Sequence, residues 1–323
     1  MPSAPLFAMP SHAADLARIE AALAAAVRTQ DAYLDEIASH LIKAGGKLLR
    51  PVLTVVAAQV AGGAPIDDAV QGGVACELVQ TGSLCHDDVM DEADTRRGVE
   101  TVNAKWGNLQ AIVAGDFLLA RASEIAASLG TEVAALLART ISRLCEGQIE
   151  ELRHTYNAAR PEASYLSSIR GKTASLFATA ARIGGLVAGL DRPHVDALTE
   201  YGEAFGMVFQ IVDDLLDVTA TDERLGKPAG HDMVEGVYTL PVLRTLQSGG
   251  VAAAELLALF GKPLDTAERD KALEIVRANG GIASAMAVAE EWAERARGAC
   301  ELLPPSAATD VLYAAPAALI AMV

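Results

Sequence analysis

The chain of 323 residues is poor in cysteine, in aromatic side chains and in basic charge. Its four cysteines have no CxxC spacing, so neither a disulfide framework nor a zinc motif is indicated, and we expect reduced thiols in the core of a cytoplasmic protein. Lys and Arg total 26 against 42 Asp and Glu, a formal charge of −16. Nucleic-acid binding requires a basic face, so we expect no nucleic-acid partner.

Long apolar runs are missing as well. The most apolar late stretch, residues 311–323, is shorter than the about 20 residues that a membrane-spanning helix needs, and Pro316 interrupts it. The first ten residues lack the positive and apolar regions of a secretory signal. We therefore expect a cytoplasmic protein whose contact with membranes is at most peripheral.

What the chain does contain is abundant Ala and Leu, with 51% hydrophobic residues, and no run that alternates with period two. This pattern predicts an all-α fold with closely packed helices. Helices are predicted at 12–28, 31–43, 47–61, 66–91, 108–129, 131–155, 162–189, 194–218, 239–248, 251–260, 266–279, 282–302 and 307–321. Because the composition changes nowhere along the chain, residues 1–323 are expected to form one domain.

Two acidic clusters of the same form carry the chemistry. They read DDVMD, from Asp87 to Asp91, and DDLLD, from Asp213 to Asp217. Residues four apart share a helix face, so each cluster presents a pair of carboxylates. One such cluster alone is usually a solvated helix face. Two copies, each following an apolar helical run, favour Mg²⁺ held by carboxylates together with substrate phosphates.

Basic residues stand near these clusters or before them. Lys47 and Arg50 follow a Gly pair and are three residues apart, so they share a helix face. Arg96 and Arg97 come directly after the first cluster and can each bind an anion through two hydrogen bonds. In isolation these residues would be ordinary surface charges. In combination with the aspartates they predict a site for diphosphates.

With these motifs assembled, the sequence resembles the trans-isoprenyl diphosphate synthases of the polyprenyl synthetase family, of the long-chain type. The resemblance covers residues 45–241 and rests on six motifs in the family's order: GGKLLRP, LCHDDVMDEADTRRG, Gly147-Gln148, GKTASLF, FQIVDDLLD and GKPAGHDMVEGVYTLP. It implies an isoprenoid synthase fold, in which helices surround a central cavity with the two clusters facing each other at its mouth. It also implies a homodimer that takes isopentenyl diphosphate and allylic diphosphates.

The resemblance assigns the metal site to aspartates. Principal Mg²⁺ ligands would be Asp87, Asp91 and Asp213, with Asp88, Asp214 and Asp217 as direct or water-mediated partners and Asp232 holding metal-bound water. About three Mg²⁺ per active site are implied, and Mn²⁺ would serve in their place. The residues expected in catalysis are Asp87, Asp88, Asp91, Lys172, Asp213, Asp214 and Lys227.

Two substrate pockets follow from the same resemblance. The allylic diphosphate would contact Arg96, Lys172 and Lys227, with Thr173 and Gln210 lining the reacting region. The metal-free pocket for isopentenyl diphosphate would consist of Lys47, Arg50, Gln80 and Arg97. Two positions depart from the family pattern: Gln80 stands where many members have His, and Val237 stands where many have Lys. With the second change, one phosphate-binding cation is missing or is supplied from elsewhere.

Three other classes of protein share some of these features. A class I terpene cyclase usually mixes Asn, Ser or Thr with Glu in its second metal site, whereas both clusters here are all Asp. A His-Asp metal phosphohydrolase, suggested by His86 beside Asp87 and by His40, leaves the second cluster unexplained. A non-catalytic subunit of a heteromeric synthase tends to lose aspartates from one cluster, and none is lost here. Whether a second subunit is needed stays open.

Product length is expected to depend on the helix that leads to Asp87. Val79, Gly82 and Ser83 precede the cluster on this helix, and Gly82 would lie about 7.5 Å deeper than Asp87. None of the three is bulky. Gly82 either allows close packing of a neighbouring helix or marks an open cavity floor. An open floor predicts a long product, roughly C30 to C50 and suited to a quinone side chain, with C20 to C25 as the alternative.

Overall fold

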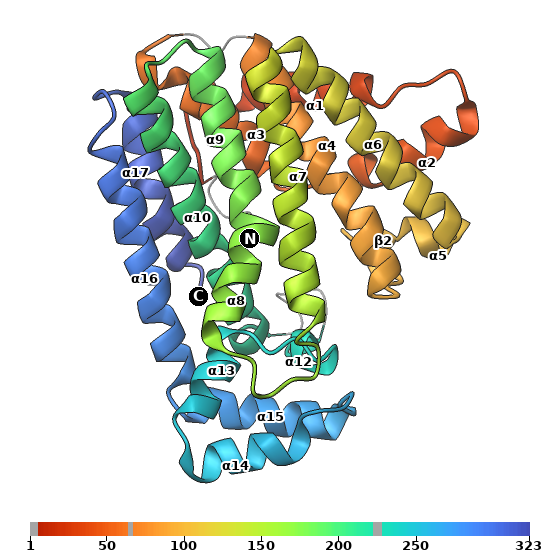
Figure 1. The fold of residues 1–323 in the computed structure, drawn as a ribbon, viewed down its shortest axis with the longest axis vertical. Helices are drawn as coiled ribbons and strands as arrows, with labels where there is room; N and C mark the ends of the chain where they lie inside the picture. The colour runs from red at the N-terminus through yellow and green to blue at the C-terminus, as the bar shows by residue number, and fades with distance from the viewer. Residues whose placement is uncertain (1–5, 64–66, 222–227) are drawn as a thin grey trace. The chain divides into compact units, whose positions relative to one another are not determined.

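The computed structural model describes residues 6–63, 67–221 and 228–323, and these are mostly helical (Figure 1). The helices that precede residue 130 are α1 (His12–Ala26), α2 (Ala32–Lys43), α3 (Leu49–Ala58), η1 (Gln59–Ala61), α4 (Asp67–Met90), α5 (Val102–Trp106) and α6 (Asn108–Ser128). The central ones are α7 (Thr131–Leu152), α8 (Glu162–Ile169), η2 (Arg170–Ala174), α9 (Ser175–Val187) and α10 (Arg192–Thr219). The later ones are α12 (His231–Val234), α13 (Leu240–Gln247), α14 (Gly250–Leu259), α15 (Thr266–Ala278), α16 (Gly281–Cys300) and α17 (Ala307–Ile320).

The prediction of an all-α fold is confirmed, and most helix boundaries lie within a few residues of those expected. Within the described residues the exception is a hairpin in which β1 (Thr95–Arg96) pairs antiparallel with β2 (Val99–Glu100). Its turn residues, Arg97 and Gly98, both have positive φ, at 54° and 77°, as a two-residue hairpin turn requires. Strands of two residues are too short to show an alternating pattern, so the sequence did not predict them.

The helix predicted over 162–189 is interrupted. Residues Arg170–Ala174 form a π-helix between α8 and α9. A π turn contains one more residue than an α turn and occurs frequently at functional sites. Apolar periodicity does not reveal such a local change of winding. The interruption contains Lys172 and Thr173, both of which the family resemblance assigns to the site.

The described chain divides into two compact units. Unit 1 comprises Met1–Ile141, Leu176–Gly202 and Ala299–Tyr313, and unit 2 comprises Ser142–Ser175, Glu203–Gly298 and Ala314–Val323. The prediction of a single domain stays a prediction. Among the described residues, no helix combines the length and the apolar content that a membrane-spanning segment requires.

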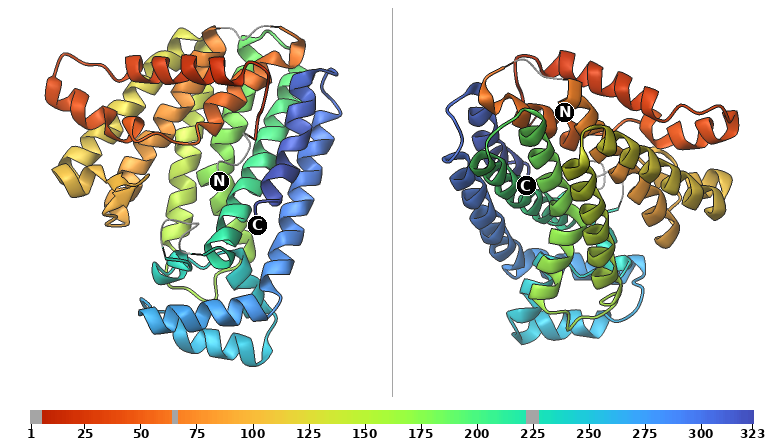
Figure 2. Two further views of the ribbon diagram at one scale, coloured as in Figure 1. Left: turned by 180° about the vertical axis from the view of Figure 1, so that it is seen from behind. Right: turned by 45° about the horizontal axis from the view of Figure 1, so that its top comes forward.

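In unit 1, α4 packs against α1, α3 and α6, and Figure 2 shows α1, α3 and α4 from two further sides. Glycines of α4 allow close approach: a Cβ atom on Gly73 would lie 2.7 Å from Cα of Pro51. Leu53, Leu78 and Leu118, from three different helices, are fully buried in this unit. α4 is therefore fixed on several sides, which positions the acidic cluster at its end.

In unit 2, a core of buried side chains joins the C-terminal part of α10 to α13, α14, α15 and α16. Met207, Ile211 and Leu215 lie on the same face of α10 and are fully buried. Tyr238 stacks on Phe260 with ring centroids 4.2 Å apart. α15 begins with a capping box, in which Asp265 and Glu268 exchange hydrogen bonds with each other's backbone.

Candidate active site

The first acidic cluster lies at the C-terminal end of α4 in unit 1. Asp87 and Asp88 belong to the last turn, and the backbone N–H of Asp91 donates a 2.8 Å hydrogen bond to the carbonyl oxygen of Asp87. Asp87 and Asp91 therefore keep the helical spacing of four residues that places both on one face. Asp87 is half-buried and Asp91 is exposed. These two carboxylates stand where a buried helix meets the surface.

Asp88 has a different environment, because its side chain is completely buried. Its Oδ1 accepts a 2.7 Å hydrogen bond from Nε of Arg96, and Nη2 of the same guanidinium forms an ion pair with Oδ1 at 2.6 Å. Within the described chain, Oδ2 of Asp88 has no hydrogen-bond partner. Burial raises the pKa of the Asp88 carboxyl, and the charge of Arg96 opposes that shift. A buried carboxylate oxygen without a donor is suited to a cation.

The donors of both clusters are carboxylate oxygens, with no cysteine among them, and such donors suit Mg²⁺ or Ca²⁺. Over residues 6–63, 67–221 and 228–323, no three His, Cys, Asp or Glu side chains lie close enough together to hold a metal ion. Each cluster belongs to a different unit. The donor chemistry therefore fits Mg²⁺, and the metal-ligand assignments stay predictions.

Also in unit 1, the guanidinium group of Arg97 lies between α2, α4 and the Gly45-Gly46 turn. Arg97 Nη1 donates to the carbonyl oxygen of Leu41 at 3.0 Å, and Nη2 donates to Oε1 of Glu77 at 3.2 Å. A Cβ atom on Gly46 would lie 3.0 Å from Cζ of Arg97. Gly46 thus leaves the space that this guanidinium occupies.

Arg50 lies in the same pocket, with its guanidinium 4.3 Å from the centroid of the Phe177 ring. Burial lowers the pKa of Arg50 to about 10, against the charge of Glu77, which raises it. Arg50 therefore remains a cation at neutral pH. Lys47 is exposed in the turn before α3, and Gln80 is half-buried on α4. These three residues and Arg97, the four predicted for the isopentenyl diphosphate pocket, all belong to unit 1.

The second acidic cluster lies on α10 in unit 2. Asp213 is exposed, whereas Asp217, four residues later, is buried with 4% of its surface exposed. The backbone N–H of Asp232 lies 3.4 Å from Oδ2 of Asp217. The structure thus brings Asp232, predicted to hold metal-bound water, next to the second cluster.

Asp214, the middle member of that cluster, is buried in a hydrogen-bond network. Its Oδ2 accepts from the hydroxyl of Tyr165 at 2.6 Å, and its Oδ1 accepts from Nε2 of Gln210 at 2.8 Å. Oε1 of Gln210 in turn accepts from Thr173 at 2.7 Å. Burial, and after it the charge of Asp232, raise the pKa of Asp214 well above its usual range. Both of its oxygens are already used within the protein.

Lys172 is positioned by a close approach of two helices. A Cβ atom on Gly147, in α7, would lie 2.5 Å from the backbone nitrogen of Lys172, and one on Gly171 would lie 2.8 Å from the carbonyl oxygen of Arg143. Glycines at these two positions allow the backbones to pack directly. The Nζ atom of Lys172 donates to Oε1 of Glu151 at 2.7 Å. The conspicuous Gly147-Gln148 motif thus has a packing reason.

Sequence reasoning missed three residues of these sites: Glu77, Glu151 and Tyr165. Glu77 had a visible signal, since it is a charged residue within a long apolar run of α4. Glu151 and Tyr165 are unremarkable in the sequence, and only the fold places them beside Lys172 and Asp214.

Other predicted residues need separate comment. Lys227 lies outside the described residues. Val237, which replaces the common Lys, is half-buried, and its N–H donates to the carbonyl oxygen of Asp232 at 2.8 Å. The preceding Gly236 has φ +78° and lies against the ring of Tyr156, so a side chain there would collide with it.

The hypothesis of an open cavity floor at Gly82 is wrong. A Cβ atom on Gly82 would lie 3.0 Å from the carbonyl oxygen of Gly115 and 3.3 Å from Cγ of Leu119, both on α6. Gly82 is buried because α4 and α6 pack closely there, which was the alternative reading. Val79 is also buried and Ser83 is half-buried. The influence of Val79, Gly82 and Ser83 on product length stays a prediction.

His86 is likewise explained by packing with α6. Its Nε2 lies 3.1 Å from the carbonyl oxygen of Ile112 and 3.6 Å from Oδ1 of Asp116. The ring lies against Gly115, where a side chain would leave it no room. His86 therefore has a local structural partner, which disfavours the phosphohydrolase reading.

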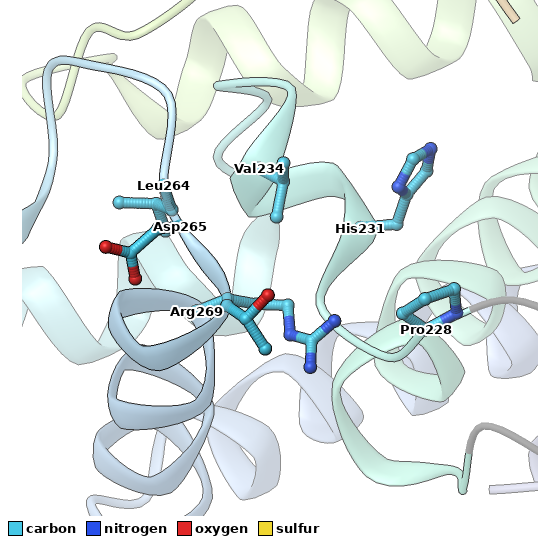
Figure 3. A pocket seen from close by; sticks show the side chains of 7 residues that line it. Pro228, His231, Val234, Leu264, Asp265 and Arg269 are labelled. Carbon is cyan, nitrogen blue, oxygen red and sulfur yellow. The ribbon is translucent and has the colours of Figure 1, made fainter.

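Unit 2 also contains a small pocket away from these residues. It is lined by Pro228, His231, Val234, Leu264, Asp265, Thr266 and Arg269, and its volume is about 180 Å³ (Figure 3). None of the predicted site residues that the structure describes lines it. It is not the central cavity that the family resemblance implies.

Comparisons with known proteins agree with the motifs. The profile of the family described as polyprenyl synthetase matches residues 31–276. Heptaprenyl diphosphate synthase component 2 of Geobacillus stearothermophilus is 41% identical over 299 residues, covering 92% of each chain. Nonaprenyl diphosphate synthase of Mycobacterium tuberculosis is 41% identical over 293 residues, covering 90% of this chain and 87% of the relative.

A solved structure is similar over most of the chain. The polyprenyl synthase of Caulobacter crescentus, complexed with calcium and isoprenyl diphosphate, matches with a TM-score of 0.90 and 34% identity, over 95% of this chain and 94% of the other. The chain therefore belongs to the polyprenyl synthetase family. It is a polyprenyl diphosphate synthase, a prenyltransferase of isoprenoid biosynthesis with the isoprenoid synthase fold. The family, fold class and enzyme class predicted from the motifs are confirmed.

Proposed function

We propose that this protein extends an allylic diphosphate with isopentenyl diphosphate to a long trans-polyprenyl diphosphate, roughly C30 to C50, that supplies a quinone side chain. The observation that carries this proposal is that a heptaprenyl and a nonaprenyl diphosphate synthase are each 41% identical over about nine-tenths of the chain. A product of C20 to C25, geranylgeranyl or farnesylgeranyl diphosphate, is the alternative that the experiment below tests.

The reaction divides between two binding sites. Lys47, Arg50, Gln80 and Arg97 bind the diphosphate of isopentenyl diphosphate without metal. Arg96, Lys172 and Lys227 bind the allylic diphosphate, and Thr173 and Gln210 line the region where the two substrates react. The pairing of Thr173 with Gln210, and of Gln210 with Asp214, supports a fixed orientation of this lining.

Asp87, Asp91 and Asp213 would be the principal Mg²⁺ ligands, with Asp88, Asp214, Asp217 and Asp232 nearby. When bound, Mg²⁺ supplies electrostatic stabilisation of the charge that develops on the leaving diphosphate. The cationic side chains of this chain add to that stabilisation. No protein nucleophile is required, and the departing diphosphate accepts the proton that the product loses.

The enzyme acts as a homodimer, and the outer face of α6 supports this. Leu109 is 77% exposed and Val113 is 58% exposed in the single chain, and Ile112 lies between them on the same exposed side. Large apolar side chains grouped on one helix are typical of protein–protein interfaces. We propose a second copy of this chain as the partner, in the cytoplasm, with contact to a membrane surface when the apolar product is released.

Product analysis tests the proposed activity. Purified protein is incubated with Mg²⁺, labelled isopentenyl diphosphate and either a farnesyl or a geranylgeranyl primer, and the dephosphorylated products are separated by chain length. Products of about C30 or longer are expected. Products that stop at C20 or C25 would establish the alternative. No turnover by the chain alone, followed by turnover after addition of a cell extract, would show that a second subunit is needed.

A further inference from the structure

Glu77 places a buried carboxylate inside a pocket that is proposed to bind an anion. Only 4% of its surface is exposed, and it lies on α4 three residues before Gln80. A buried carboxylate is costly unless it is paired, and near a diphosphate it would also repel the ligand. Because Glu77 is unfavourable both for stability and for binding of an anion, we expect it to have a role that compensates.

The contacts of Glu77 indicate that role. Its Oε1 accepts a 3.2 Å hydrogen bond from Nη2 of Arg97, while Nη1 of the same guanidinium donates to the carbonyl oxygen of Leu41. Gly46 lies beside the same guanidinium, where a Cβ atom would come within 3.0 Å of Cζ. Two hydrogen-bond acceptors thus hold Arg97, and of these two Glu77 is the charged one.

Charge adds a second effect. The charge of Arg97 lowers the pKa of Arg50, and the charge of Glu77 raises it. Burial raises the pKa of Glu77, and the charges of Arg50 and Arg97 oppose that rise. One carboxylate therefore interacts with both arginines of the pocket.

We propose that Glu77 is a positioning residue for isopentenyl diphosphate: its carboxylate holds the guanidinium of Arg97, and through charge that of Arg50, in the arrangement that receives the diphosphate. This inference rests on the proposed function of the pocket. Glu77 does not itself contact the substrate.

The direction in which Glu77→Gln changes the affinity for isopentenyl diphosphate separates a positioning role from simple repulsion. If Glu77 only repelled the ligand, replacing it by the neutral Gln would tighten binding. If Glu77 positions Arg97, the same replacement weakens binding, because a neutral acceptor holds a guanidinium less strongly than a carboxylate does.

The test measures binding of isopentenyl diphosphate to the full chain by calorimetry without metal, and the KM of both substrates with Mg²⁺. For Glu77→Gln we expect Kd and KM for isopentenyl diphosphate to rise about ten-fold, with the KM of the allylic primer unchanged. Glu77→Asp should restore part of the loss. The matched control is Glu162→Gln, since Glu162 also pairs with an arginine, Arg244 at 2.6 Å, but outside this pocket.

A double variant tests whether the effect passes through Arg97. In an Arg97→Ala background, Glu77→Gln should cause little further rise in KM for isopentenyl diphosphate. Three results would each overturn the proposal. Glu77→Gln could bind isopentenyl diphosphate more tightly than wild type, or it could change the KM of both substrates equally. The rises in KM caused by Glu77→Gln and Arg97→Ala could also be fully additive in the double variant. If the wild-type protein neither binds isopentenyl diphosphate nor turns over, the proposed function itself fails, and this outcome is recognisable before any variant is made.

Discussion

The hydroxyl of Tyr165 donates a 2.6 Å hydrogen bond to Oδ2 of Asp214, and both side chains are buried in unit 2. The bond joins α8 to the second acidic cluster on α10. It fixes the middle aspartate of that cluster inside the protein, whereas Asp213 beside it is exposed. The two adjacent aspartates of the motif therefore have different environments, and we expect them to respond differently to mutation.

Tyr165→Phe should lower the free energy of unfolding by about 1 to 3 kcal/mol, because it leaves a buried carboxylate oxygen without its donor. Chemical denaturation measures this change. Tyr313→Phe is the matched control, since Tyr313 is 48% exposed. A Tyr165→Phe variant as stable as wild type would mean that the hydrogen bond contributes no net stability.

Metal dependence is the second expectation. Turnover should be lost in excess EDTA and should return when Mg²⁺ or Mn²⁺ is added. Asp87→Ala and Asp213→Ala should each abolish turnover, because each removes a proposed metal ligand. The control is Asp68→Ala, an exposed aspartate at the opposite end of α4. Rates near wild type for either cluster variant would show that its carboxylate is a solvated surface group.

Gly46→Ala tests the space beside Arg97. The added Cβ would lie 3.0 Å from Cζ of Arg97, closer than carbon atoms normally pack, so the guanidinium must move. We expect a higher KM for isopentenyl diphosphate and an unchanged KM for the allylic primer. Gly63→Ala is the control, because its Cβ would meet no atom within 4 Å. An unchanged KM would show that Arg97 adapts without loss.

The stability of Glu77→Gln relative to wild type should depend on pH. Burial raises the pKa of the Glu77 carboxyl above its ordinary 4.5, so the folded protein holds this proton more tightly than the unfolded chain. The stability that Glu77 contributes is therefore fully present below about pH 4.5 and is lost as pH rises through the folded pKa.

Relative to Glu77→Gln, wild type should accordingly lose stability as the pH rises above about 4.5. Denaturant unfolding of both proteins across this range checks the direction. A gain for wild type over the same range would mean that the two arginines outweigh burial and hold the pKa of Glu77 below its ordinary value.

Gly82→Phe should destabilise the protein by about 1 to 3 kcal/mol or more, because a ring cannot fit between α4 and α6 without moving them. Melting temperature and product length are measured together. A shorter product from a protein with normal melting would show instead that the tail of the product passes beside Gly82, and that α6 can give way there.

Helical periodicity was sufficient for most of the fold. The helices predicted at 108–129 and 131–155 begin at the observed first residues of α6 and α7 and end one and three residues too late. The π-helix at Arg170–Ala174 was not predictable, because a segment of five residues is too short to show a change of helical period in the sequence. The hairpin around Arg97 and Gly98 was missed because its strands are only two residues long.

The two acidic clusters of the candidate site could be predicted because the same motif occurs twice in the sequence. The hydrogen-bond partners of these residues could not, because only the fold brings them together. The paired DDxxD clusters stand out in the sequence, but Tyr165 reaches Asp214 only because α8 lies beside α10. Gly82 shows the opposite limit: a small residue in a helix signals close approach, and the sequence does not say whether another helix or a substrate approaches.

The ion pair between Lys172 and Glu151 has a consequence for selectivity. The ammonium group of Lys172 has three N–H donors, and one of them already donates to Glu151. An incoming anion therefore binds beside a carboxylate whose charge partly offsets that of the lysine. A ligand with a single negative charge gains little from such a pair. A diphosphate carries several charges and gains more, so we expect simple carboxylates to compete poorly with the substrate even at high concentration.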